Sequence, residues 1–242
     1  MIRAIIFDFN GVIADDETPH VICFAQALAE ENLSLTKEEY YGTYLGMDER
    51  TCTRMLLTKR DGACNEHQLL RIGQRKAELF RLYTARHKVQ LFPGVIEFVK
   101  TAKARYRLAI ASGGRRAQID AALSGSPIEH DFEVIVAAED CPVGKPDEAI
   151  YRLTCERLNA GRVGSDTIKP AECLVIEDSL AGIQSAKAAG MLVTALGTTY
   201  PLDKLGEADC LFQSLQNVTP EAMISQLARI GHEGRFIDTG PR

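Results

Sequence analysis

Side chains that could bind a cation or attack an electrophile occur where four apolar stretches of the chain end. They are Asp8 and Asn10 after the first stretch, Ser112 after the second, Lys145 in the loop after the third, and Glu177 with Asp178 after the fourth. Taken singly, each has an ordinary structural explanation, such as a strand-end cap, a helix N-cap or a solvated lysine. If the stretches are parallel strands, however, their carboxyl ends lie at one edge of a sheet, where ligands bind in open α/β folds. The ordered combination therefore predicts one shared site.

The carboxylates of this set suit a hard divalent cation and a nucleophile. Asp8, Glu177 and Asp178 would form an anionic, oxygen-rich site, which is the environment that Mg²⁺ prefers. A carboxylate at the same place can also attack phosphorus and form an aspartyl-phosphate. We therefore expect Asp8 to be the nucleophile and Mg²⁺ to be the cofactor.

The remaining polar groups suit the oxygens of a phosphoryl group. Ser112 and the amides of Gly113 and Gly114, at the start of a helix, could hold these oxygens. Lys145 could neutralise their charge and that of Asp8. Phosphoryl transfer depends above all on positioning and on charge stabilisation, and these residues supply both. The sequence thus predicts a phosphoryl-transfer site.

Strands and helices alternate around these residues. Continuous apolar runs predict strands at 5–8, 107–112, 133–137, 173–176, 192–196 and 209–212. Such runs are typical of strands buried on both faces, and helices between them imply right-handed crossovers and a parallel sheet. One of these helices is expected to begin at Pro146, and the polar tail 231–242 is expected to be loose. The fold class is therefore α/β, with a Rossmann-like parallel sheet core.

A helical block separates the first strand from the second. From residue 20 to 87 apolar residues recur at helical spacing, as at Val21, Phe24 and Leu28, and no strand interrupts them. The block therefore reads as an insertion into the α/β core. We expect a core domain of residues 1–15 and 89–242 and an all-helical cap domain of residues 16–88.

Composition narrows the class of partner. The chain has 242 residues, 45% of them hydrophobic, and a net charge of -5 without a long basic run, which argues against nucleic acid. No apolar run reaches the roughly 20 residues of a membrane span, and the start does not resemble a signal peptide. The seven cysteines are scattered without a CxxC pair, which favours reduced thiols. We expect a cytoplasmic protein, a monomer or weak homodimer, that acts on a small metabolite.

Together these stretches resemble the haloacid dehalogenase (HAD) superfamily of phosphotransferases. The resemblance is strongest to the branch that holds β-phosphoglucomutase and related sugar-phosphate phosphatases, and it extends from Asp8 to about Leu196. The four family motifs are matched by Asp8-Phe9-Asn10-Gly11-Val12-Ile13, by Ser112, by Lys145 and by Glu177-Asp178-Ser179-Leu180-Ala181-Gly182-Ile183. The resemblance implies Mg²⁺ held by Asp8, the backbone carbonyl of Asn10, and the acidic pair Glu177 and Asp178. It also implies that the helical insertion closes over the substrate.

Asn10 departs from the family pattern. Phosphatases and mutases of this family have an aspartate there, which protonates the leaving oxygen and then activates the attacking group. An amide donates hydrogen bonds but cannot act as a carboxylate acid or base, a role typically worth about 10²–10⁴-fold in rate. Three explanations stay open: another group such as Asp15, Asp16, Glu17 or His20 supplies the proton, the substrate has a good leaving group, or turnover is slow.

The resemblance also points to residues of the insertion that would meet the substrate. His20 and Lys76 match polar cap positions of the branch, and Glu17 lies beside them. These positions are shared by phosphatases and mutases, so they do not separate the two activities. A structural explanation, as a helix-start residue for His20 and a solvated lysine for Lys76, is equally open. Lys76 matches only in type the Schiff-base lysine of a phosphonatase.

The segment around Gly46 resembles a substrate-recognition loop. The mutase has an arginine there that holds a second phosphate, whereas alignment at Gly46 puts Glu49 in its place and Arg50 one residue later. A shift of one residue on a helix turns a side chain by about 100°, which argues against a second phosphate at Arg50. The alternative is a solvated Arg50 on a helix face.

These observations predict a Mg²⁺-dependent phosphohydrolase for a small phosphorylated metabolite, a sugar phosphate, with a covalent intermediate on Asp8. A β-phosphoglucomutase-like mutase is the rival enzyme. A phosphometabolite-binding protein with little turnover, because of Asn10, is the rival of another class. A dehalogenase is disfavoured because that chemistry needs no cation and hence no Glu177-Asp178 pair.

Overall fold

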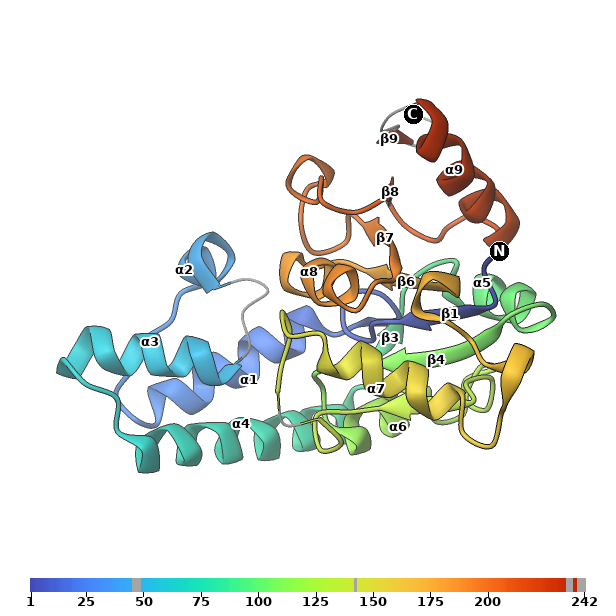
Figure 1. Ribbon diagram of the computed structural model, residues 1–242. Coiled ribbons are helices and arrows are strands. Elements are labelled where there is room, and N and C mark those ends of the chain that lie inside the picture. The colour runs from blue at the N-terminus through green and yellow to red at the C-terminus, as the bar shows by residue number, and fades with distance from the viewer. Residues whose placement is uncertain (45–48, 142, 234–236, 239–242) are drawn as a thin grey trace. The chain divides into compact units, whose positions relative to one another are not determined.

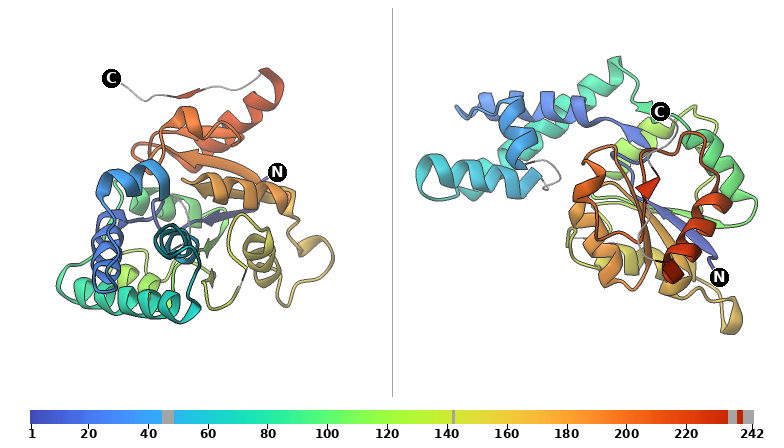
Figure 2. Two further views of the ribbon diagram at one scale, coloured as in Figure 1. Left: turned by 90° about the vertical axis from the view of Figure 1, so that its left-hand side faces the viewer. Right: turned by 90° about the horizontal axis from the view of Figure 1, so that it is seen from above.

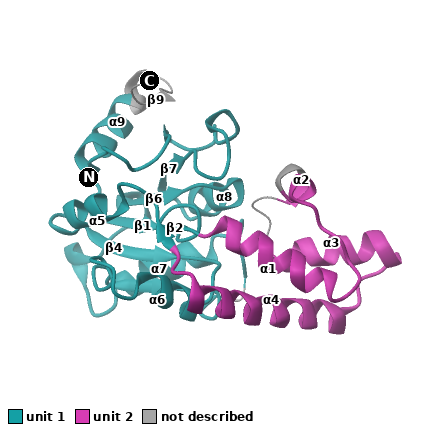
Figure 3. Ribbon diagram, turned by 180° about the vertical axis from the view of Figure 1, so that it is seen from behind, with its two compact units in different colours: residues 1–15, 90–242 teal, residues 16–89 magenta. Residues whose placement is uncertain are grey.

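The protein is known from a computed structural model, which describes residues 1–44, 49–141, 143–233 and 237–238. The chain divides into two compact units, residues 1–15 with 90–242 and residues 16–89 (Figure 3). The predicted boundary at the end of the helical insertion lies between residues 88 and 89, and the observed boundary lies between residues 89 and 90. A short antiparallel ribbon marks both divisions, because β2 (Ala14–Asp15) pairs with β3 (Gln90–Leu91).

The first unit is built on a parallel sheet with the strand order β5-β4-β1-β6-β7-β8-β9 (Figures 1 and 2). Its strands are β1 (Ala4–Phe7), β4 (Arg107–Ala111), β5 (Val134–Val136), β6 (Cys173–Glu177), β7 (Leu192–Leu196), β8 (Cys210–Phe212) and β9 (Ile237–Asp238). Every neighbouring pair is parallel, which confirms the predicted α/β core. β1 has β4 on one side and β6 on the other, so the carboxyl end of β1 is the point at which strand order reverses.

Helices cover both faces of this sheet. They are α5 (Val95–Lys103), α6 (Arg116–Leu123), α7 (Ala149–Leu158), α8 (Leu180–Ala188) and α9 (Pro220–Glu233), with short 3₁₀ turns at Gly164–Asp166, Pro170–Glu172 and Leu202–Lys204. The side chains of β1 alternate between the faces. Ala4 and Ile6 join the apolar cluster of α7 and α8, whereas the Phe7 ring packs edge-on against Phe98 of α5 at 6.0 Å between centroids. Burial on both faces explains why this strand is apolar throughout.

The regular secondary structure of the second unit is helical throughout its described residues (Figure 3). It consists of α1 (Glu17–Ala29), α2 (Lys37–Glu39), a π-helical turn (Tyr40–Tyr44), α3 (Glu49–Asp61) and α4 (Glu66–Arg86). α4 begins at a clear signal, because the Asn65 side chain accepts hydrogen bonds from the amides of His67 and Gln68. Phe24, Leu28, Leu57, Leu69 and Ile72 belong to one apolar core. Among the described residues of the whole chain, no helix is both long and apolar enough to cross a membrane.

Two local predictions need correction. The helix expected from Pro146 begins at Ala149. A turn precedes it, because the Asp147 amide donates to the Gly144 carbonyl and the Asp147 Oδ1 accepts from the Ala149 amide at 2.9 Å. The tail is predicted to be loose from residue 231, but α9 continues to Glu233 and β9 pairs with β8, while residues 234–236 and 239–242 lie outside the described residues. Strand β8 would otherwise leave backbone groups unpaired at the sheet edge.

Candidate active site

Asp8 directly follows the central strand of the sheet. Its amide donates to the Ile176 carbonyl at 2.9 Å, so the backbone at Asp8 continues the pairing of β1 with β6. The residue as a whole is 7% exposed. The carboxylate is therefore held nearly out of solvent at the carboxyl edge of the sheet, where the sequence predicted it.

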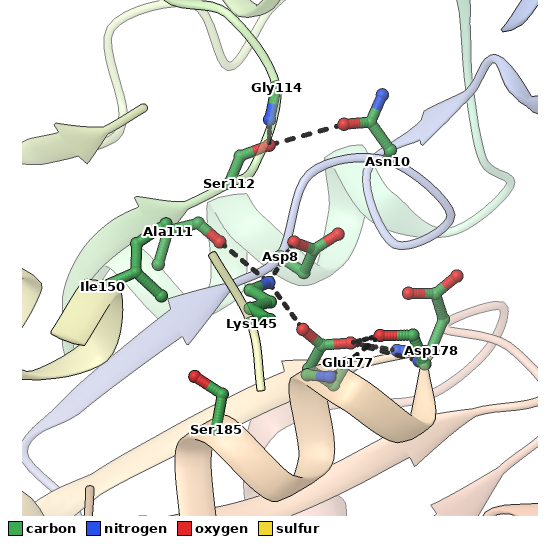
Figure 4. A network of polar contacts seen from close by, with 12 residues as sticks. Asp8, Asn10, Ala111, Ser112, Gly114, Lys145, Ile150, Glu177, Asp178 and Ser185 are labelled. Carbon is green, nitrogen blue, oxygen red and sulfur yellow. Dashed lines mark hydrogen bonds and ion pairs between the residues drawn. The ribbon is translucent and has the colours of Figure 1, made fainter. Parts of the chain in front are cut away.

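Lys145 joins two of the predicted acidic residues (Figure 4). Its Nζ lies 2.5 Å from Asp8 Oδ1, 2.6 Å from Glu177 Oε1 and 3.3 Å from the Ala111 carbonyl oxygen. The three protons of the ammonium match these three acceptors. Burial alone disfavours the charged amine, but the charges of Asp8 and Glu177 outweigh it and raise the pKa of Lys145 well above its usual value. Lys145 is thus a fixed positive charge against Asp8.

Glu177, at the end of β6, is fully buried and has hydrogen-bond donors at both oxygens. Oε1 accepts from Lys145 and from the Tyr151 hydroxyl at 2.8 Å. Oε2 accepts from the amides of Asp178 at 2.9 Å and Ser179 at 3.1 Å, and from the Ser179 hydroxyl at 3.0 Å. Burial opposes ionisation of this group, but Lys145 and the hydrogen bonds prevail and lower the pKa of Glu177.

These five donors revise the expectation that Glu177 is a direct metal ligand. An ionised carboxylate offers about four lone-pair sites, and protein groups already engage Glu177 at both oxygens. The arrangement fits a residue that holds Lys145 and the following loop in place. The position of Glu177 also explains why residue 182 is a glycine, because a β-carbon on Gly182 would overlap the Glu177 carboxylate.

Asp178 is also buried. Its main charged neighbours are carboxylates, whereas Glu177 has the ammonium of Lys145 beside it. Its Oδ2 accepts a hydrogen bond from the Thr199 hydroxyl. Burial and the nearby charges of Glu177 and Asp8 raise the pKa of Asp178 well above its usual value. A buried carboxylate beside two other carboxylates lacks a compensating positive charge, and a bound cation is one way to supply it.

The residues present therefore fit a hard divalent cation in a narrower form than the sequence suggested. The carboxylates of Asp8 and Asp178, with the backbone carbonyl of Asn10, would hold it, and all three offer oxygen, the donor that Mg²⁺ prefers. In the part of the chain that the structure describes, no three acidic, histidine or cysteine side chains are already gathered as a metal cluster. Lys145, which lies between Asp8 and Glu177, accounts for this in part.

Ser112 and Asn10 lie side by side at the ends of their strands (Figure 4). The Ser112 hydroxyl is 3.4 Å from Asn10 Oδ1, and its oxygen accepts from the Gly114 amide at 2.9 Å. The Gly114 amide, predicted to hold phosphoryl oxygens, is thus engaged by Ser112. Gly113 is exposed, and a β-carbon there would meet no atom of the described residues within 4 Å. Of the two amides, that of Gly113 is the better candidate for an anion.

In the helical unit, His20 and Lys76 form one polar cluster. Lys76 Nζ lies 2.7 Å from His20 Nδ1, and His20 Nε2 lies 3.1 Å from Asp16 Oδ2. Because an ammonium only donates, Nδ1 accepts, and the ring proton sits on Nε2 and is donated to Asp16. The His20 ring stacks on Phe80 at 4.1 Å between centroids. Lys76 is 7% exposed, so it is not the solvated lysine of the structural alternative.

The other residues predicted in the helical unit do not all belong to this polar cluster. Glu49, and not Arg50, joins the cluster, with its Oε2 2.7 Å from Lys76 Nζ. The Arg50 side chain is 63% exposed and pairs with Glu66 at 3.2 Å, so it does not belong to the cluster. Glu17 begins α1, and its Oε1 is buried without a hydrogen-bond partner among the described residues. Gly46 lies outside the described residues.

Three contacts of the core site were not predicted. Tyr151, Thr199 and Gly182 touch Glu177 or Asp178, but none belongs to a set of polar strand ends. Tyr151 lies in α7, and the sequence pattern there predicted only a helix with an apolar face, which gives no sign of a site residue. Thr199 had a usable signal, since it follows the predicted strand 192–196 at the same edge of the sheet as the other site residues.

Comparison with known proteins bears on the family. Residues 2–190 match the family model of the haloacid dehalogenase-like hydrolases. The chain belongs to this family. The match spans most of both units and includes all four strand ends that carry the site, which confirms the membership predicted from the motifs.

Named relatives of this HAD-like hydrolase include sugar-phosphate phosphatases. It is 30% identical over 231 residues to the protein CbbY of Rhodobacter capsulatus, covering 92% of this chain and 97% of the relative. It is 28% identical over 232 residues to the phosphorylated carbohydrates phosphatase of Thermotoga maritima, covering 94% and 99%. The crystal structure of an aspartate-to-asparagine mutant of CbbY from Rhodobacter sphaeroides, in complex with xylulose-(1,5)bisphosphate, matches with a TM-score of 0.76 and 27% identity over 92% and 99% of the two chains.

Proposed function

We propose that this chain is a Mg²⁺-dependent phosphohydrolase for a small phosphorylated sugar, with a phosphoenzyme on Asp8. The observation that carries the proposal is the contact of Lys145 with Asp8 at the carboxyl end of the central strand. The Asp8 carboxylate and the phosphoryl oxygens that it approaches are all negatively charged. The attack therefore needs a positive charge beside Asp8. Lys145, which is held in place by its ion pair with Glu177, supplies this positive charge.

The reaction has two steps. An Asp8 oxygen attacks phosphorus, the bond from phosphorus to the sugar oxygen breaks, and that oxygen takes up a proton. Water then attacks the aspartyl-phosphate, gives up a proton, and releases inorganic phosphate and free Asp8. Lys145 offsets negative charge in both steps, and we assign the binding of phosphoryl oxygens to Ser112 and the Gly113 amide. Mg²⁺, when bound, supplies further charge neutralisation and orients the phosphoryl group.

Asn10 determines how fast this reaction runs. Its amide can hydrogen-bond to the leaving oxygen but cannot give it a proton. We expect a deficit within the usual range of general acid-base catalysis, about 10²–10⁴-fold, unless water or the substrate replaces the missing acid. The mutant CbbY in complex with a sugar bisphosphate carries an asparagine for aspartate as well, which supports the view that such a change is compatible with substrate binding.

We assign substrate selection to the helical unit and its cluster of Asp16, His20, Lys76 and Glu49. The cluster contains one ammonium and two carboxylates, and it buries Lys76 almost completely. Buried polar groups of this kind are costly unless they are satisfied, and here they pair with one another. We place the enzyme in the cytoplasm, because all seven cysteines are free thiols. We also keep the prediction that it is a monomer or weak homodimer.

The decisive experiment measures phosphate release from a panel of sugar monophosphates, sugar bisphosphates, acetyl phosphate and phosphonoacetaldehyde, with Mg²⁺ and with EDTA. The native chain, Asp8→Asn and Asn10→Asp are compared. We expect Mg²⁺-dependent release by the native chain, none by Asp8→Asn, and an increase of about 10²-fold or more in Asn10→Asp. Trapping of labelled phosphate that hydroxylamine removes would identify the acyl phosphate. Activity that survives Asp8→Asn would contradict the proposal.

Asn10 also favours a second candidate, a phosphometabolite-binding protein with negligible turnover. In that case the native chain binds members of the panel without releasing phosphate, and only Asn10→Asp is active. A phosphomutase would convert a sugar phosphate into its isomer without net phosphate release. Because that cycle needs proton transfer in both halves, Asn10 argues against it.

A further inference from the structure

The loop after β7 brings two threonine hydroxyls to the core site. The Thr198 hydroxyl donates to the Gly11 carbonyl at 2.5 Å, and the Thr199 hydroxyl donates to Asp178 Oδ2. Gly11 belongs to the loop that follows Asp8, and Asp178 follows β6. The two threonines therefore connect the loop of the nucleophile with the acidic loop, although they belong to neither.

Gly11, Asp178 and Thr199 are packed against one another. A β-carbon on Gly11 would overlap the Asp178 carboxylate and approach the Thr199 hydroxyl to 2.8 Å. Gly11 also has a φ of 79°, a conformation that side chains other than glycine rarely adopt. The backbone at Gly11 thus closes one side of Asp178, and Thr199 hydrogen-bonds to the carboxylate on another. Together they leave Asp178 little rotational freedom.

The hydroxyl of Thr199 serves Asp178 in a specific way. A threonine hydroxyl has a single proton, and here the proton goes to a carboxylate oxygen. The hydrogen bond fixes the direction in which Oδ2 points, and with it the orientation of the whole carboxylate. Groups that hydrogen-bond to metal ligands typically affect metal affinity about 10–100-fold.

We propose that Thr199 is a positioning residue that orients Asp178 for a divalent cation. The inference rests on the proposed function to the extent that it takes Asp178 as a cation ligand. Thr199 touches neither the cation nor the phosphoryl group in this assignment. It fixes the rotation of the ligand carboxylate, and without its hydroxyl the carboxylate must be ordered at the moment when the cation binds.

The test is cation affinity in the absence of substrate. Mn²⁺ is the probe, because the electron paramagnetic resonance signal of free Mn²⁺ reports binding directly. The full chain is compared as native protein, as Thr199→Val, which replaces the hydroxyl by a methyl group of similar size, and as Thr199→Ser, which restores a hydroxyl. We expect the Kd for Mn²⁺ to rise about 10–100-fold in Thr199→Val and to return to within about 3-fold of native in Thr199→Ser.

Thr194→Val is the matched control. Thr194 is a fully buried threonine of β7, the strand that leads to the loop of Thr199, and its Oγ1 has no hydrogen-bond partner among the described residues. The same chemical change is therefore made five residues away without loss of a hydrogen bond. We expect unchanged Mn²⁺ affinity and a protein at least as stable as the native chain, since a buried unsatisfied hydroxyl is costly.

The outcomes separate this inference from the proposed function. Equal Mn²⁺ affinity in the native chain and Thr199→Val would overturn the role of Thr199 and leave the cation site intact. A native chain that does not bind Mn²⁺ would overturn the site and the inference together. Circular dichroism and thermal melting establish folding. If Thr199→Val does not fold, Thr199→Ala takes its place, and equal weakening in Thr199→Ser would contradict the role of the hydroxyl.

Discussion

Gly182 leaves the space of its missing side chain to the carboxylate of Glu177. Gly182 lies in the first turn of α8 and donates its amide to the Ser179 hydroxyl at 3.1 Å, and that hydroxyl in turn donates to Glu177. A β-carbon at Gly182 would overlap the Glu177 carboxyl group itself. The start of α8 and the residue that holds Lys145 are thus fitted to each other.

We expect Gly182→Ala to inactivate the enzyme by displacing Glu177 and with it Lys145. A helical Gly to Ala change normally stabilises by about 1 kcal/mol, so loss of activity with lower stability would identify the steric effect. Phosphate release and urea unfolding measure the two quantities. Gly73→Ala is the control, because Gly73 lies inside α4 and a β-carbon there comes no closer than 3.7 Å to a described atom outside that helix. Full activity of Gly182→Ala would contradict the prediction.

Tyr151 supports the same ion pair from the side of α7. Its hydroxyl donates to Glu177 Oε1, and its ring lies 5.0 Å from Lys145 Nζ. Tyr151→Phe removes only the hydroxyl, and hydrogen bonds to charged groups are worth about 1.5–3 kcal/mol. We expect unfolding by urea to show a loss of that size and kcat to fall roughly 10-fold with KM little changed. Tyr151→Leu, which also removes the ring, should lower kcat further, and equal kcat in the two variants would exclude a role of the ring.

We expect the ionisation of Asp131 to make the free energy of unfolding depend on pH in the acid range. The carboxylate is 5% exposed and pairs with Lys100 at 2.7 Å and Lys103 at 2.5 Å. Burial raises its pKa, but the hydrogen bonds and charges of the two lysines outweigh burial, so the pKa of Asp131 is lowered. A lowered pKa in the folded state means that the pair stabilises the fold above the ordinary value of 3.8. This stabilisation is lost as the pH falls through the folded pKa.

We therefore expect Asp131→Asn to lower the free energy of unfolding by roughly 1–3 kcal/mol at pH 7. The difference from the native chain should shrink as the pH falls below the ordinary pKa of 3.8 and vanish below the lowered pKa of the folded state, as followed by urea unfolding across the acid range. Asp120→Asn is the control, because Asp120 is 54% exposed and pairs with Arg116 on the surface of α6, where an ion pair contributes little. A pH-independent difference would show that the charge of Asp131 is not the cause.

The sequence by itself determined the class of fold and the main participants. Continuous apolar strands separated by helices require a parallel sheet, and the four polar strand ends must then meet at one edge, because parallel strands share a direction. Asp8 and Lys145 followed from this rule, and Lys145 does contact Asp8. The helical insertion followed equally from the long helical period between the first two strands.

Only the tertiary structure decided which partner each side chain has. Glu177 and Asp178 are adjacent in sequence and alike in chemistry, yet Glu177 is saturated by five donors and Asp178 is held by Thr199. The difference arises because successive residues at a strand end point to opposite sides, one toward α7 and one toward the loop after β7. Side-chain direction and the closeness of segments distant in sequence are properties of packing, and local sequence does not encode them.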